Sequence, residues 1–138
     1  MINTKTGEIL LGDWPSVSSK TVLNDLTQLK DFKMDLTVEN GIYKRFFIGQ
    51  VQIAKTDFFA SLAFESDRLK SISLSLAAEH ASSWGDWSHE KEKKTKVLHN
   101  KFLQEQFNSV PPYKLAWGSV ESCLDVKTGD ARIIVTYV

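Results

Sequence analysis

The first thirty residues change from a strand pattern to a helical one. Thr6–Gly12 is predicted to form a short strand, and Asp13–Pro15 a turn, because proline lacks a backbone hydrogen-bond donor. A helix is predicted over about Lys20–Lys30, with Ser18 or Ser19 as its cap, because apolar residues recur there at helical spacing. Those apolar residues are Val22, Leu23, Leu26 and Leu29.

From Met34 onward, apolar and polar residues alternate with the period of a strand. Asn40-Gly41 follows, a pair typical of a two-residue type I′ hairpin, which would place Val38 opposite Tyr43. We interpret one face of this hairpin as a core face. Its members are Met34, Leu36, Val38, Tyr43 and Phe47.

Further strands are predicted along the rest of the chain. In Leu69–Ala77, Ile72, Leu74 and Leu76 alternate with serines, which indicates one buried and one solvated face. Both faces of Ala131–Val138 are largely apolar, which favours a strand covered on both sides. The other predicted strands are Gln50–Lys55, Phe58–Glu65 and Tyr113–Val126.

A second helix is predicted from about Ser88 to Asn108 and ends before Pro111-Pro112. Leu98, Phe102, Leu103 and Phe107 fall on one half of its surface. With few helices between successive strands, a parallel sheet lacks its crossovers. The fold class predicted for residues 1–138, taken as one domain, is α+β: an antiparallel sheet of about six to eight strands with two helices packed mainly on one face.

Charge and cysteine content narrow the function classes. Lys plus Arg and Asp plus Glu number 17 each, so the net charge is zero and a nucleic-acid partner is not expected. No apolar run reaches the ~20 residues of a membrane span, and none after Lys5 has the length of a secretory signal. The single Cys123 excludes an internal disulfide, so a cytoplasmic protein without membrane contact is expected.

Few residues are candidates for catalysis or for metal binding. His89-Glu90 lacks the second histidine that a zinc helix needs at position 93, and His80 and His99 have no ligand at helical spacing, so neither metal nor cofactor is expected. His99 lies within the apolar helix face. It is either a general base or, as we favour, a half-buried residue bonded to a carbonyl or carboxylate. Cys123 is interpreted as a small buried hydrophobe. The lysines of the second helix are interpreted as a solvated face rather than a phosphate site; they are Lys91, Lys93, Lys94, Lys96 and Lys101.

The segment Trp84-Gly85-Asp86-Trp87 is the candidate binding site. Two tryptophans in a polar loop either fold back against the protein or form an exposed apolar patch, and such patches mark interaction sites. Asp86 beside them adds a charge that would select a basic partner. Trp84, Asp86 and Trp87 are therefore the predicted partner-binding residues, with no catalytic residues assigned.

The closing stretch carries a resemblance. Trp117-Gly118, then Asp125-Val126-Lys127-Thr128-Gly129 and an alternating apolar strand, resembles the C-terminal hairpin of small, uncharacterised bacterial α+β proteins. Proteins of this build include immunity proteins, which bind and neutralise a cognate toxin. The resemblance implies no catalytic residues.

Three functional hypotheses follow. The first is a non-catalytic bacterial binding protein, an immunity- or antitoxin-like inhibitor of a protein partner. The second is a small-ligand or carbohydrate-binding module that uses exposed tryptophans. The third is a small enzyme without a recognisable motif. The sequence specifies neither the partner nor the oligomeric state.

Overall fold

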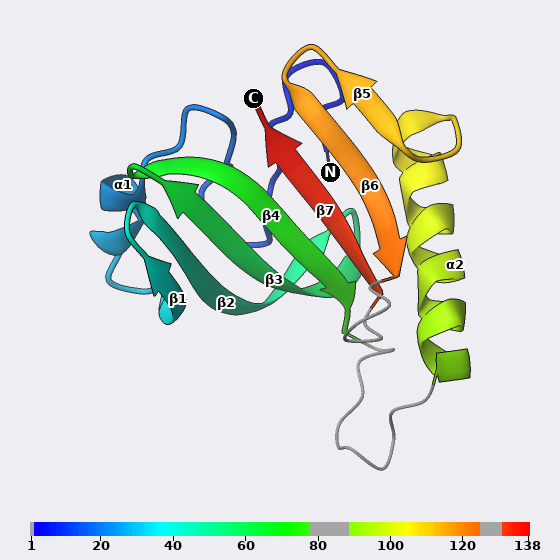
Figure 1. Ribbon diagram of the computed structural model, residues 1–138, viewed down its shortest axis with the longest axis horizontal. Helices are drawn as coiled ribbons and strands as arrows, with labels where there is room; N and C mark the ends of the chain where they lie inside the picture. Colours follow the sequence, from blue (N-terminus) through cyan, green and yellow to red (C-terminus); the bar gives the residue numbers. More distant parts are fainter. Residues whose placement is uncertain (1, 78–88, 125–130) are drawn as a thin grey trace.

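A single antiparallel sheet of seven strands dominates the computed structural model, which describes residues 2–77, 89–124 and 131–138 (Figure 1). The helices are α1 (Leu23–Thr27) and α2 (His89–Phe107). The strands are β1 (Asp35–Asn40), β2 (Tyr43–Ile53), β3 (Thr56–Glu65), β4 (Arg68–Leu76), β5 (Tyr113–Leu115), β6 (Gly118–Leu124) and β7 (Ala131–Tyr137). The predicted α+β class is confirmed. Within the described ranges, neither helix combines the length and apolarity needed to cross a membrane.

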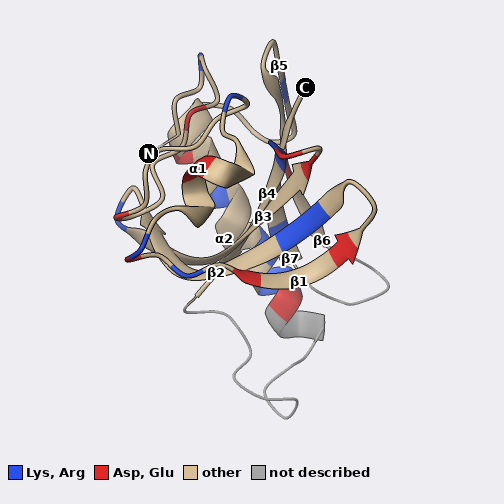
Figure 2. Cartoon of the chain, turned by 90° about the vertical axis from the view of Figure 1, so that its left-hand side faces the viewer, with Lys and Arg blue, Asp and Glu red and all other residues tan. Residues whose placement is uncertain are grey.

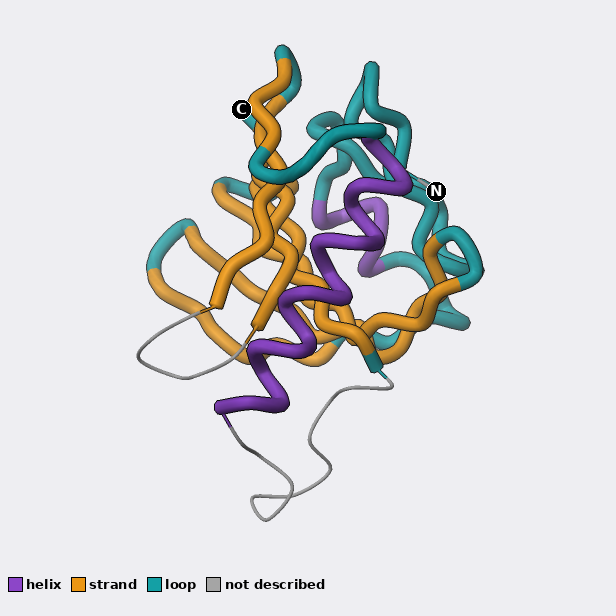
Figure 3. Tube along the Cα trace, turned by 90° about the vertical axis from the view of Figure 1, so that its right-hand side faces the viewer, coloured by secondary structure: helices purple, strands orange, loops and turns teal. Residues whose placement is uncertain are grey.

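The strand order is β1-β2-β3-β4-β7-β6-β5, so the last strand of the chain lies between β4 and β6. Neighbouring strands are antiparallel throughout. In Figure 1, α2 runs alongside β6, and the N-terminal segment passes behind the sheet. Figure 3 shows α2 and the N-terminal loops on the same side of the long strands. One sheet face is therefore the core face.

Alternation along β4 and β7 separates the two faces of the sheet. Ile72 and Leu74 are fully buried, whereas the serines between them are half-buried. In β7, Ile133 and Val135 are buried, while Ile134 is only half-buried. Within the described residues, the helices and the N-terminal segment cover the face of Ile133 and Val135, and the apolar Ile134 lies half-buried on the other, so only one face of the strand is fully buried.

The N-terminal segment packs on the core face but forms no regular strand. Thr6–Gly12 was predicted to be a strand, yet only isolated bridges join Ile9 to Ile2 and Val17. Positive φ angles at Gly7 (78°) and Gly12 (57°) turn the backbone at both ends of this stretch. Two side-chain donors hold the segment: the Tyr137 hydroxyl donates to the Gly7 carbonyl (2.8 Å), and the Trp117 indole donates to the Thr4 carbonyl (3.0 Å).

The first helix is shorter than predicted, and neither serine caps it. Its N-cap is Val22, which is extended and bridges to Arg68, and the Leu23 N–H donates to the Asp67 carbonyl at 2.8 Å. Pairing with the β3–β4 turn thus keeps Lys20–Val22 out of the helix. Leu23 and Leu26 are buried as the periodicity predicted.

The β1–β2 hairpin differs from the prediction in register and burial. The turn residues are Gly41 and Ile42, with Asn40 opposite Tyr43 and Val38 opposite Arg45. Gly41 has φ 62° at the first central position, where a type II′ turn places glycine. The whole of β1 is exposed, so the predicted core face of this hairpin was wrong.

Two further strands have boundaries that differ from the predicted ones. The predicted strand Gln50–Lys55 is the second half of β2, which continues past a bulge near Gly49. The predicted strand Tyr113–Val126 divides into β5 and β6, because the chain reverses at Ala116–Trp117. Gly118 must be glycine, since an added Cβ would lie 1.9 Å from the Thr136 carbonyl oxygen.

The second helix confirms both its predicted range and its buried face. It packs chiefly against β6 and β7, with fewer contacts to β4. Phe102 and Leu103 are buried, and Phe107 stacks on Tyr113. The ring of Phe102 meets that of Phe58 on β3 edge to face, with centroids 4.9 Å apart. The Phe102 side chain thus reaches β3, one strand beyond β4 in the sheet.

Candidate functional site

The predicted partner-binding residues Trp84, Asp86 and Trp87 lie outside the described residues, so the assignment remains a prediction. The other two tryptophans are buried. Trp14 is 7% exposed and packs against Phe32, and Trp117 is 8% exposed. Neither of these two indoles therefore presents an open ring face to solvent.

His99 is a fully buried core residue. Its Nε2 accepts a hydrogen bond from the backbone N–H of Leu76 at 3.1 Å, which joins α2 to the end of β4. Nδ1 has no partner within the described part of the chain. Desolvation lowers the pKa of His99 from 6.5 to about 4, so the ring is neutral at pH 7. His99 is thus a structural residue, but the predicted details were wrong: the ring is fully buried instead of half-buried, and its partner is a backbone N–H instead of a carbonyl or carboxylate.

Cys123 is half-buried on the outer face of β6. Its Sγ lies 3.8 Å from a carboxylate oxygen of Glu121. Burial first, and then the Glu121 charge, raises the pKa of the Cys123 thiol, the opposite of what an activated nucleophile needs. Among the described residues, no three His, Cys, Asp or Glu side chains gather as metal ligands would.

The β1–β2 hairpin exposes apolar side chains. Leu36 is 49% exposed, Val38 41% and Ile42 62%. Figure 2 shows this hairpin at the front of its face, with acidic segments on β1 and a basic segment on β2. Such an edge strand with apolar side chains is a surface on which another chain can dock.

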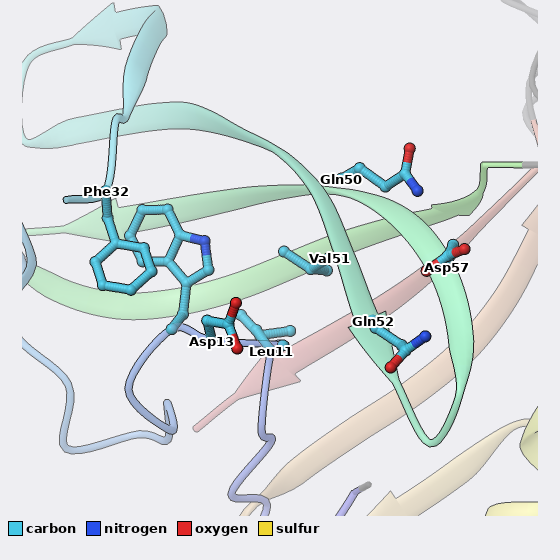
Figure 4. A pocket seen from close by; sticks show the side chains of 9 residues that line it. Leu11, Asp13, Phe32, Gln50, Val51, Gln52 and Asp57 are labelled. Carbon is cyan, nitrogen blue, oxygen red and sulfur yellow. The ribbon is translucent and has the colours of Figure 1, made fainter.

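A pocket of about 430 Å³ opens between the N-terminal segment and the bend of β2 (Figure 4). Leu11 and Val51 are buried in its lining, and the Trp14 and Phe32 rings form a tilted pair with centroids 4.6 Å apart. The polar lining residues are Asp13, Gln50, Gln52 and Asp57.

Backbone contacts fix the shape of this pocket. The Gly12 N–H donates to the Gln52 carbonyl at 2.8 Å, and the Trp14 N–H donates to the Leu11 carbonyl at 3.0 Å. A Cβ on Gly12 would lie 3.3 Å from the Gln52 nitrogen, and φ there is 57°. A larger residue would therefore strain this approach to β2.

From the sequence, Asp13–Pro15 was expected to form a turn only, and no role was predicted for Phe32, Gln50, Gln52 or Asp57. These residues meet because β2 bends at its bulge near Gly49 and the N-terminal segment docks against it. The one local signal was a tryptophan next to an aspartate and a proline. Nothing in the residue spacing linked this tryptophan to Gln50, Gln52 or Asp57.

Comparison with protein families gives no match, and comparison with curated proteins gives none either. Among solved structures, the chain is similar to a chain of the structure titled "Rhs1-CT in complex with cognate immunity protein RhsI1". The TM-score is 0.63 at 15% sequence identity, and the match covers 99% of this chain and 85% of that one. At this identity, the match shows a shared fold.

Proposed function

We propose that this protein is a non-catalytic inhibitor that binds a protein partner, in the manner of an immunity protein. The observation that carries the proposal is the fold, which this chain shares along almost its whole length with a chain of a toxin–immunity complex. The immunity-like resemblance of its C-terminal sequence points the same way. We place its action in the cytoplasm, in keeping with its single free cysteine.

The chemistry of the described residues supports binding over catalysis. The buried His99 imidazole contacts a backbone amide and has no nucleophile among its hydrogen-bond partners. Cys123 lies beside a carboxylate that disfavours its thiolate. A general base or an activated nucleophile would instead line a cleft within reach of its substrate.

We further propose that Trp84, Asp86 and Trp87 contact the partner. Truncation of an exposed aromatic side chain at an interface centre typically weakens binding by at least ~2 kcal/mol. Trp84→Ala and Trp87→Ala are expected to weaken the complex by that amount and to leave the unfolding temperature nearly unchanged. If either substitution unfolds the protein, that tryptophan is a core residue and not a contact.

Co-expression tests the proposed function. The polypeptide encoded immediately upstream of this chain's gene is produced in a bacterial host with and without this protein, and growth is followed. We expect growth arrest by the upstream polypeptide alone, rescue by this protein, and a complex that survives size-exclusion chromatography. An upstream polypeptide that is harmless, or that arrests growth regardless of this protein, contradicts the proposal.

A further inference from the structure

We propose that the pocket formed by Leu11–Trp14, Phe32, Gln50–Gln52 and Asp57 receives an arginine or lysine side chain of the protein partner. This inference rests on the proposed function, because it assumes a protein partner, and it adds the chemistry of one contact. The pocket combines a charge, a set of hydrogen-bond acceptors and an apolar wall in one concave surface. A long cationic side chain matches all three.

The charge of the lining comes from two carboxylates. Asp13 and Asp57 are both exposed, and no lysine or arginine lies among the lining residues. Within the described ranges, neither carboxylate forms an ion pair; Lys33, next to Phe32 in sequence, pairs instead with Asp35 at 3.8 Å. The lining therefore carries a formal charge of about −2, which favours a cation over a neutral or anionic group.

The hydrogen-bonding groups lie around the bend of β2, where the exposed Gln50 and Gln52 alternate with the buried Val51. Figure 4 shows Asp13 and Asp57 on opposite sides of Val51, with Gln50 and Gln52 above and below. Carboxylate oxygens accept hydrogen bonds, and each glutamine amide adds a carbonyl acceptor. A guanidinium group presents five N–H donors in a plane and can use such acceptors from more than one direction.

The apolar wall suits the stem of the same side chain. Leu11 and Val51 are 0% and 4% exposed and so offer little surface to a ligand; the accessible part of the wall is the half-buried Phe32 ring, which packs on the Trp14 indole. A methylene stem buries apolar area against such a wall while its charged end stays at the rim. A cation over the face of the Phe32 ring would also gain a cation–π attraction.

The pocket exists before any partner arrives. The Gly12–Gln52 hydrogen bond and the Trp14–Phe32 ring contact hold three chain segments together without a ligand. A preformed site avoids the ordering cost that a flexible loop incurs on binding. A single side chain inserted here can therefore act as an anchor for the complex.

A small probe tests the pocket independently of any toxin. Isotope-labelled protein is titrated with the peptide acetyl-Gly-Arg-Gly-amide and with its neutral citrulline counterpart, while NMR follows the side-chain signals of Trp14, Gln50 and Gln52. We expect saturable shifts with the arginine peptide, at least tenfold weaker binding of the citrulline peptide, and no shifts in an Asp13→Asn/Asp57→Asn variant. Equal binding of both peptides, no binding of either, or the same shifts with Ca²⁺ alone would overturn the proposal.

The partner itself provides the second test. Affinity for the upstream polypeptide is measured for Asp13→Asn and Asp57→Asn, with Glu105→Gln on the exposed side of α2 as a control for net charge. We expect at least tenfold weaker binding for each pocket variant and less than twofold for the control. A complex that forms with unchanged affinity in both pocket variants refutes the cation site and leaves the proposed function standing. If the wild-type protein does not bind the upstream polypeptide, the proposed function is refuted.

Discussion

Replacing Phe102 by alanine tests whether the core lies where α2 meets the sheet. The Phe102 side chain is 6% exposed, and its ring packs edge to face on Phe58 at 4.9 Å. Truncation removes the ring from a site that the surrounding sheet cannot refill, which costs about 3–5 kcal/mol in cavity and transfer terms. Since a domain is stable by about 5–15 kcal/mol, this is a third or more of the total for many proteins.

Urea unfolding followed by circular dichroism measures this loss. With an m-value of about 2 kcal/mol/M, the midpoint is expected to fall by about 1.5–2.5 M. Val97→Ala on the same helix is the matched control, because Val97 is 65% exposed and its truncation should change stability by less than about 0.5 kcal/mol. If Phe102→Ala does not fold, Phe102→Leu should still show a loss of about 1–2 kcal/mol. A loss below about 1 kcal/mol for Phe102→Ala would show that this helix face is not buried.

Four further substitutions test three separate features of the structure. Tyr137→Phe removes the buried hydroxyl that donates to Gly7, and urea unfolding should show a loss of about 1–3 kcal/mol, whereas no loss would mean that this bond does not hold the N-terminal segment. Leu36→Thr and Val38→Thr should each cost less than about 0.5 kcal/mol by the same assay because β1 is exposed; a loss above 2 kcal/mol would restore the core face predicted from sequence. Burial lowers the pKa of His99 to about 4, so the unfolded chain takes up a proton between pH 6.5 and 4 that the folded protein does not. Stability should therefore fall as pH decreases through that window, and His99→Gln should flatten the decline; an equally steep decline in the variant would assign it to other groups.

The sequence predicted the elements whose burial follows local periodicity. In β4 and α2, a regular apolar face coincides with the face that packs, so Ile72, Leu74 and Phe102 were placed correctly. In β1 the same alternation was misleading. Leu36 and Val38 alternate as core residues do, but a bulge separates them in the pairing with β2. In addition, the helices and the N-terminal segment that cover the core face do not cover β1, which is exposed along its whole length.

The candidate pocket could not be predicted for a different reason. Its lining joins the N-terminal segment, the loop before β1 and the bend of β2, and these segments meet only through tertiary packing. The bend depends on a bulge near Gly49, which adds a residue without leaving a periodic signal. The direction of the His99 hydrogen bond likewise depends on where the end of β4 lies, which the helix sequence does not encode.

The most direct test of inhibition is a titration of the purified upstream polypeptide with this protein. The toxic activity of a fixed amount of that polypeptide is measured while this protein is added from zero to a twofold molar excess. The account predicts a linear fall in activity that reaches zero at a 1:1 ratio, as tight stoichiometric binding requires. Activity that persists at twofold excess, or that this protein removes at far below stoichiometric amounts by turnover, would contradict a non-catalytic inhibitor.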